Sequence, residues 1–440
     1  MAVVPHERPI RLVVRDDSLE RSRLTVFFRL ILAIPLFIWL VLWGIAAFAV
    51  AFVLWLAVLI NREAPRNLHD FVAAYLRFST HFGAYIFLAA NPYPWFRGRP
   101  GYPVDLEIDP PEPQGRWGGF FRLFLALPAL LLAAALGGGV SSGSPSSASS
   151  ASGSEDTVYY GVATVGGVAT AVAFLAWWAI VVRGRAPRGF RDLVAYALGY
   201  GAQATGYLLL LTPRYPSSDP KLAEGYSELP EHPVRIDVED GLEHSRLTVF
   251  FRFLLTIPHF IWLFLWGIAV WFAVVIAWFV ALVIGRVPDA LHRFIAAYIR
   301  YATHVFAFLH LVGRRFPGFT GKAGSYEIDL EIAPAARQNR WKTLFRLFLG
   351  IPAFIVAGTL SGVLFVLAFL GWWYTLVTGR MPEGLRNLGA GCLRYEAQTY
   401  AYAMLATDRY PYGAPVLRGK PEPTQLAFDQ ALPPAAGEAS

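Results

Sequence analysis

Four long apolar runs dominate the chain, and each is followed by a basic turn and then by an aromatic, partly charged segment. The first run, residues 27–60, has 34 residues, and Arg29 is the charged residue within it. As a single helix it would extend roughly 51 Å at ~1.5 Å per residue, whereas the hydrocarbon core of a bilayer is only ~30 Å thick. We therefore expect each run to fold into a helical hairpin, the first with its turn near Trp43 and Gly44. An interfacial helix before Pro35, followed by one long tilted span, is the alternative.

The second run favours the hairpin, because a Gly- and Ser-rich stretch, residues 137–156, lies inside it. A flexible polar loop is not stable in hydrocarbon, so this stretch predicts that the middle of the run reaches water. Neither Lys nor Arg occurs between Arg122 and Arg183, while Glu155 and Asp156 lie in the stretch. By the positive-inside rule, we expect both ends of every hairpin, and both termini of a multi-pass cell-membrane protein, to be cytoplasmic.

The segments after the basic turns have the pattern of amphipathic helices. In the first, aromatic residues recur at a 4-3-4-3 spacing on one helix face: Phe71, Tyr75, Phe78, Phe82 and Tyr85. Polar residues occupy the other side: Asp70, Arg77, Thr80 and His81. Helices of this kind tend to lie in the membrane interface, which would give the protein eight spans. A third crossing in each unit, giving twelve spans, is the alternative.

Regularly spaced residues show that these segments form four repeated units. In each unit an Arg precedes a Pro by six residues: Arg29 and Pro35, Arg122 and Pro128, Arg252 and Pro258, Arg346 and Pro352. The Pro of the following turn lies 30 residues further on in three units and 59 in the second, which contains the Gly/Ser stretch. The first unit's SRLTVFFRLILAIP nearly equals the third's SRLTVFFRFLLTIP, and the second unit resembles the fourth. A two-unit half was therefore duplicated, in the order A-B-A-B.

A short alternating stretch opens each unit and predicts a β-strand. The sequence thus predicts an all-α polytopic membrane protein of four helical-hairpin units, with amphipathic third helices and short cytoplasmic β-strands that form a small shared sheet. The expected boundaries are 9–102 for membrane unit A1, 103–220 for unit B1 with its loop at 137–156, 221–232 for a linker, 233–325 for unit A2, 326–412 for unit B2, and 413–440 for a disordered tail.

Three motifs recur in the units: F-R-x-x-L-x-x-P at the start of a run, G-R-x-P at the turn, and T-D-R-Y-P at Thr407–Pro411. Through them nearly the whole chain resembles an uncharacterised bacterial integral-membrane family, known only as a domain of unknown function. The first unit departs from the pattern at its turn, where Asn61 and Arg62 replace Gly-Arg. The resemblance implies a membrane protein and brings no activity with it.

The composition agrees with a membrane protein. Hydrophobic residues make up 55% of the chain and charged residues 16%, against about 25% charged in soluble domains, and the mean hydropathy is +0.44. The net charge of +7 predicts contact with anionic lipid headgroups rather than with nucleic acid, since no Lys/Arg run stands apart from the apolar segments. Cys392 is the single cysteine, which excludes an intrachain disulfide and a cysteine-cluster metal site. No signal-peptide core precedes the first run, so we expect that run to stay as an uncleaved anchor.

The four arginines that precede the Pro are candidate contacts for lipid headgroups. We call Arg29, Arg122, Arg252 and Arg346 the repeat arginines. A guanidinium offers a planar fork that suits phosphate. The simpler interpretation is that each side chain extends to the headgroups and anchors its run at the interface.

The third helices carry a second repeated polar pattern. Twelve residues after the turn Pro stand Arg77, Gly199, Arg300 and Arg394, and four residues further stand His81, Gln203, His304 and Gln398. The i, i+4 spacing places each pair on one helix face. The arginines are further candidate headgroup contacts, and the His and Gln residues form a candidate polar site. The simpler interpretation is a polar stripe that faces water or bonds to the apolar runs.

We find no catalytic residues, and we expect no cofactor and no metal. Residues 139–143 match G-x-S-x-G, but they lie in the Gly/Ser stretch without the strand-to-helix context of a nucleophile elbow, so the match is ascribed to chance. The hypothesis is a non-enzymatic membrane protein that binds or organises lipid, or acts as a scaffold for partners that the sequence does not identify. The alternative is a small-solute transporter or channel, which internal repeats favour and nearly charge-free runs disfavour.

Overall fold

The computed structural model describes residues 8–15, 19–137, 167–220, 231–239 and 241–414. Twelve helices and four strands lie in these ranges, so the chain is mostly helical, as the apolar pattern predicts. Three helices are long and apolar enough to cross a membrane: α2 (Arg29–Asn61), α8 (Arg246–Ile284) and α11 (Arg346–Thr378). The protein is therefore of a kind that associates with membranes.

Each of these three runs is one continuous helix, so the predicted hairpin is wrong for them. Gly44, at the expected turn, lies inside α2. It serves close packing instead, because a Cβ there would come 3.1 Å from the Tyr75 hydroxyl, and Gly267 of α8 has the same relation to Tyr298. An unbroken helix satisfies its own backbone and tolerates a glycine at a cost of about 1 kcal/mol, so nothing forces a turn. The counts of eight and twelve spans assumed hairpins and are wrong for the same reason.

The second run is described only at its two ends. They form the shorter apolar helices α5 (Arg122–Gly137) and α6 (Val168–Arg183). Several predictions fall outside the described residues: the loop beyond Gly137 with its G-x-S-x-G match, most of the linker, and the tail from residue 415.

The two apolar runs of each half lie head to tail and meet at their ends. Short helices precede three of the runs: α1 (Arg23–Phe27), α4 (Arg116–Phe120) and α10 (Arg340–Leu344). α1 packs against α6, α4 against α2, and α10 against α8. Arg116 donates to the Ile60 carbonyl at 2.9 Å and Arg340 to the Val283 carbonyl at 2.8 Å. α4 and α10 thus each satisfy a carbonyl left over at the end of the neighbouring run.

The third helices pack against the apolar runs and have 21 residues each: α3 (Arg66–Ile86), α7 (Arg188–Leu208), α9 (Asp289–Leu309) and α12 (Glu383–Ala403). The predicted aromatic face of α3 packs on α2, where Phe78, Phe82 and Tyr85 form a cluster with Leu36 and Leu40. Its other sides contact α7 and a β-strand. Thr80 and His81 of the predicted polar side are buried by protein, while Asp70 near the start of α3 is exposed. The interfacial or shallow re-entrant position of these helices stays a prediction.

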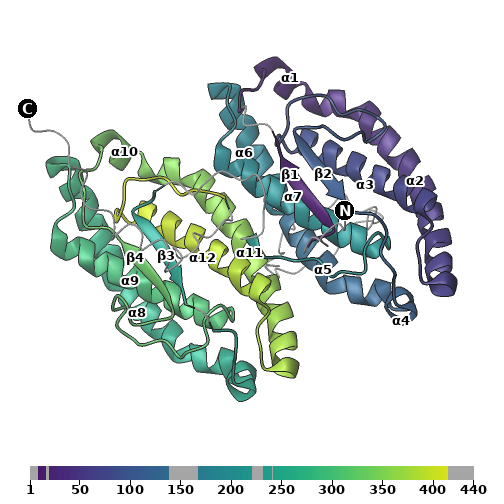
Figure 1. The fold of residues 1–440 in the computed structure, drawn as a ribbon. Coiled ribbons are helices and arrows are strands. Elements are labelled where there is room, and N and C mark those ends of the chain that lie inside the picture. Colours follow the sequence, from purple (N-terminus) through teal and green to yellow (C-terminus); the bar gives the residue numbers. More distant parts are fainter. Residues whose placement is uncertain (1–7, 16–18, 138–166, 221–230, 240, 415–440) are drawn as a thin grey trace, which may run out of the picture.

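The predicted strands form two sheets instead of one. β1 (Ile10–Val14) pairs with β2 (Val104–Ile108), and β3 (Val234–Val238) pairs with β4 (Ile328–Ile332), both antiparallel. β1 packs on α7 and β2 on α3, while β3 packs on α12 and β4 on α9 (Figure 1). Since each sheet takes one strand from an A unit and one from a B unit, the pairing joins the units into halves.

The two halves lie side by side, as Figure 1 shows, and they share one hydrophobic core. α11 contacts α5 and α6 across the boundary. The loop that ends each half also reaches the third helix of the other half. A Cβ on Gly189 would come 2.8 Å from the Gly413 amide, and one on Gly384 would come 2.8 Å from the Ser218 hydroxyl. Each half thus contacts the third helix of the other half through its final loop, and this symmetry agrees with the duplication.

Candidate functional site

The repeat arginines are buried and bond to the protein's own backbone. Arg29 Nη1 donates to the carbonyls of Tyr85, at 2.8 Å, and Ala90, at 3.2 Å. Arg252 donates to Phe308 and Gly313, and Arg346 to Tyr402 and Thr407, at the same sequence separations of 56 and 61 residues. Arg122 donates to Thr212, 90 residues away, because its unit contains the insertion. Each of these side chains is between 2% and 4% exposed.

Each repeat arginine also lies over the ring at the end of the third helix. The guanidinium carbon lies 4.3 Å from the Tyr85 ring centroid in the first unit, and the other units repeat the contact: Arg122 on Tyr207, Arg252 on Phe308, and Arg346 on Tyr402. Carbonyl oxygens and an aromatic face both attract a cation, so both compensate the positive charge of the guanidinium. In unit A2 the buried carboxylate of Glu327 also acts on the charge of Arg252. In unit B2, Asp408 adds a carboxylate at 2.9 Å.

These contacts close the C-terminal end of each third helix. One leucine after every third helix adopts a left-handed conformation, with φ between 62° and 67°: Leu88, Leu210, Leu311 and Leu405. This conformation is unfavourable for a residue with a Cβ, at a cost of about 1 kcal/mol, so it needs support from the surroundings. The backbone turns there and presents its carbonyls to the guanidinium.

The structure therefore directs the repeat arginines into the protein. A lipid phosphate would have to displace carbonyl contacts that each guanidinium already makes. The repeat arginines therefore do not extend to the headgroups as interface anchors, and their guanidinium groups are not free to hold a phosphate. The signal in the sequence was the fixed Arg-to-Pro distance, which marked a structural role without showing the partner.

The predicted polar pairs lie between the third helices and the sheets. His81 Nε2 donates to Asp105 Oδ1 at 2.8 Å, and Arg77 Nε donates to the Leu106 carbonyl at 2.9 Å. In the second half His304 bonds to Asp329 at 2.9 Å, and Arg300 bonds to the Leu330 carbonyl at 2.7 Å. Both aspartates are strand residues that sequence reasoning missed. Their place at the second position of VDL and IDL, in the strands that open the B units, was the available signal.

The aspartates are held as carboxylates. Burial opposes the charged form of Asp105, but hydrogen bonds from His81 and from two backbone amides outweigh it and hold the pKa of this carboxyl below its ordinary value. Burial and the bond from His304 act in the same opposed way on Asp329, whose pKa is also lowered. A carboxylate so well supplied with donors is a structural acceptor, and it joins the helix to the sheet.

The B units use glutamine in place of histidine. Gln203 accepts from the Ser217 amide at 3.0 Å, and Gln398 accepts from the Tyr412 amide at 3.1 Å. Gln398 also donates to the Val234 carbonyl of β3. Arg394 bonds to the Ala414 carbonyl, and Gly199, at the equivalent position, packs against Leu12. The predicted polar set is thus four local connections, one per third helix, and the structure does not bring its members into one site.

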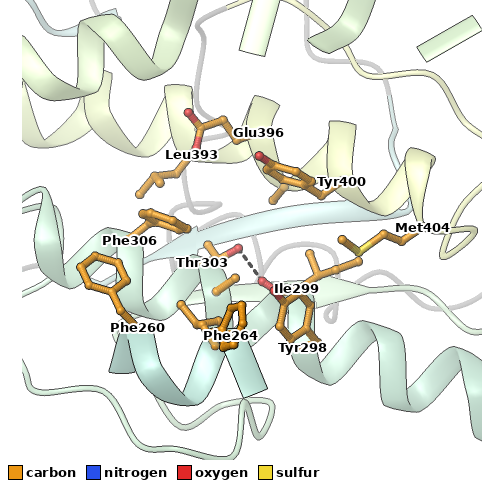
Figure 2. Close-up of a pocket in the computed structure, with 13 residues that line it drawn as sticks. Phe260, Phe264, Tyr298, Ile299, Thr303, Phe306, Leu393, Glu396, Tyr400 and Met404 are labelled. Carbon is orange, nitrogen blue, oxygen red and sulfur yellow. Dashed lines mark hydrogen bonds between the residues drawn. The ribbon is translucent and has the colours of Figure 1, made fainter. Parts of the chain in front are cut away.

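A cavity of about 330 Å³ lies between α8, α9 and α12 in the second half (Figure 2). We call it the α8–α9–α12 cavity. Aromatic and aliphatic side chains form most of its wall, among them Phe260, Phe264, Tyr298, Phe306 and Tyr400. One carboxylate, Glu396 of α12, joins this wall. Phe264 is 70% exposed, so the cavity borders the outward apolar surface of α8.

Glu396 was missed by sequence reasoning. It accepts a hydrogen bond from Ser361 of α11 at 2.6 Å. Burial raises the pKa of Glu396 to about 7, and the bond from Ser361 lowers it by less. A carboxyl on a third helix, facing an apolar run, was the signal available in the sequence.

Among the residues that the structure describes, no group of three or more His, Cys, Asp or Glu side chains could hold a metal ion. Cys392 is buried in the core shared by the halves.

A family model described as Domain of unknown function (DUF4389) matches the chain four times, at residues 23–97, 158–218, 246–320 and 340–414. The first three matches fall inside units A1, B1 and A2, and the fourth covers most of unit B2 and ends two residues past its predicted boundary at 412. The tandem fourfold repeat is therefore confirmed. No curated protein and no solved structure matches the chain.

Proposed function

We propose a function from the geometry of the structure, because this chain belongs to the family described as Domain of unknown function (DUF4389), and that description assigns no activity. The protein is a non-enzymatic membrane protein that binds lipid. An acyl chain from the surrounding bilayer occupies the α8–α9–α12 cavity.

One observation carries this proposal: the cavity is apolar and lies beside a candidate span. Leu263 and Phe264 of α8 line it, and α8 is long and apolar enough to cross a membrane. Pockets of ~300–1,000 Å³ with mostly hydrophobic walls are typical of small-molecule sites. Because the neighbouring outer surface of α8 is also apolar, a ligand reaches the cavity from lipid more readily than from water.

The test is lipid retention after gentle extraction. Native mass spectrometry of the wild-type protein should show a bound lipid or other amphiphile. Ala302 lines the cavity from α9, so Ala302→Phe should fill it and remove the bound mass. Ala290→Phe is the matched control, because Ala290 is exposed on the same helix and outside the cavity. Equal retention by both variants, at equal folded yield, contradicts the proposal.

Anionic headgroups have a separate place in the proposal. The repeat arginines are occupied, but exposed basic residues lie where the runs meet, such as Arg62, Arg66 and Arg116 at the end of α2. Arginine and lysine near a membrane surface attract anionic lipid by about 1 kcal/mol each. Replacing these three by Gln should reduce the share of anionic lipid that co-purifies, while the cavity ligand stays.

The orientation is also proposed. We place both termini, and the face that carries the two sheets, in the cytoplasm of a cell-membrane protein. Ser325 is exposed in the loop before β4. In a Cys392→Ala background, Ser325→Cys should react with an impermeant thiol reagent in inside-out vesicles and stay unlabelled in intact cells. Labelling in intact cells reverses the orientation.

A further inference from the structure

We propose that the α8–α9–α12 cavity selects an amphiphile with a positively charged ammonium group, and that Glu396 is its counter-ion. This inference rests on the proposed function, because it assigns the headgroup chemistry of the same cavity.

The first argument is that a carboxylate without a nearby cation is energetically unfavourable in this wall. Glu396 stands in a wall that is otherwise mostly apolar, and its bond to Ser361 satisfies only part of its acceptor capacity. Among the residues that line the cavity there is no Lys, Arg or His. Glu396 is only partly exposed to water, and a carboxylate that loses part of its hydration with no cation beside it is destabilised. A bound ammonium group supplies the missing charge.

The second argument is that the repeat does not require Glu396. The equivalent positions on the other third helices are Ser79, Gly201 and Ala302. Its partner Ser361 likewise stands where the other runs have glycine: Gly44, Gly137 and Gly267. The repeat arginines recur in all four units and support the fold, whereas this polar pair occurs in one. Because three units fold without this polar pair, we infer that the pair has a role specific to the fourth unit.

The third argument is the aromatic wall. Tyr298 and Tyr400 come from α9 and α12, and Phe260, Phe264 and Phe306 complete the surroundings that Figure 2 shows. The face of an aromatic ring attracts a cation, most strongly where water is excluded. An anionic headgroup would instead meet the carboxylate and the negative ring faces. The chemistry therefore favours an amine or quaternary ammonium over a phosphate or a free fatty acid.

The raised pKa gives the inference a pH signature. Burial raises the pKa of Glu396 to about 7. Tyr298 and Tyr400 are the other titratable groups that line the cavity, and burial raises their pKa values above the ordinary value of 10, so they stay neutral. A permanently charged ligand binds the carboxylate form, so its affinity should rise as the pH increases through 7.

The experiment uses two probes of equal chain length in dodecyl maltoside micelles: radiolabelled dodecyltrimethylammonium, which is charged at every pH, and radiolabelled dodecanol, which is neutral. The wild-type protein should bind the ammonium probe about tenfold more tightly at pH 8 than Glu396→Gln does, a difference of roughly 1.4 kcal/mol. Binding of dodecanol should be equal for both proteins. Glu331→Gln is the matched control, since it removes the same charge from an exposed strand residue.

The outcomes separate the two proposals. If wild type and Glu396→Gln bind the ammonium probe equally, and Ala302→Phe binds neither probe, the counter-ion role is refuted and the lipid cavity stands. If Ala302→Phe binds both probes as wild type does, the cavity is not the binding site and both proposals fail. A tighter ammonium complex in wild type, growing from pH 6 to pH 8 and absent in Glu396→Gln, supports the inference.

Discussion

Arg346 contacts Tyr402 in two ways, through its backbone carbonyl and through its ring. Its Nη1 donates to the Tyr402 carbonyl at 2.6 Å, and its guanidinium carbon lies 4.8 Å from the centroid of the same residue's ring. The two residues lie at the start of α11 and near the end of α12. One side chain therefore fixes where the third helix ends against the start of its own apolar run. Units A1 and A2 repeat both contacts, and unit B1 repeats the ring contact.

The fork shape of this arginine should matter more than its charge. Arg346→Lys keeps a cation on a long stem but cannot reach the carbonyls of Tyr402 and Thr407 together with Asp408. We expect a loss of about 2–4 kcal/mol in stability, because the buried acceptors lose donors. Thermal unfolding in detergent micelles measures it. Arg340→Lys, at an exposed residue with one carbonyl bond, is the control and should change little.

The ring should be replaceable by another ring. Phe308 occupies the position of Tyr402 in unit A2 and makes the same cation contact. Tyr402→Phe should therefore be within about 0.5 kcal/mol of wild type, while Tyr402→Leu should lose roughly 1 kcal/mol or more of cation–π attraction. Equal melting temperatures for the Phe and Leu variants would show that the ring does not stabilise the arginine, and that the carbonyl bonds alone do.

The pair of His304 and Asp329 should be energetically coupled. A double-mutant cycle with His304→Ala and Asp329→Asn isolates the interaction that joins α9 to β4. We expect a coupling energy of about 1–3 kcal/mol, because the bond is largely shielded from water and charge-assisted. Strictly additive losses would show that this pair does not hold the helix to the sheet, and that packing and the bond from Arg300 to the Leu330 carbonyl do.

The pH dependence of stability should depend partly on His244. Burial, and then the charges of Arg252 and Arg314, lower the pKa of His244 to about 4. The unfolded chain has a His pKa near 6.5, so it takes up a proton first as the pH falls. The stability is fully present above pH 6.5 and declines between about 6.5 and 4, by roughly 3 kcal/mol at most.

Glutamine is the matched replacement, since Gln114 and Gln338 stand at the equivalent position and bond to their repeat arginines. His244→Gln should leave the melting temperature unchanged at pH 7.5 and raise it relative to wild type at pH 5. His232, whose pKa burial also lowers to about 4, remains in both proteins and leaves a residual slope. Parallel pH profiles for the two proteins would contradict the assignment.

The sequence predicts much of this fold because the fold repeats. Residue spacing alone locates the units, the strands and the third helices, and Arg77 and His81 were correctly placed on one helix face. The hairpin failed because chain length and hydropathy are the same for a folded run and for one long helix. The glycine at the expected turn was ambiguous too, since glycine serves a turn and a close helix contact equally well. The roles of Arg29 and Glu396 depend on partners far along the chain, which no local pattern reveals.

The antiparallel pairing of β1 with β2 limits how small a working protein of this kind can be. A single repeat expressed alone would carry one strand with no neighbour, and its long helix would lack the short helix that caps its last carbonyls. Two repeats are therefore the smallest fragment in which every strand has a pairing partner, although the half still shares its core with the other half. A natural or engineered chain with just one copy should form homodimers, in which a second molecule supplies the strand and the cap that the next repeat supplies here.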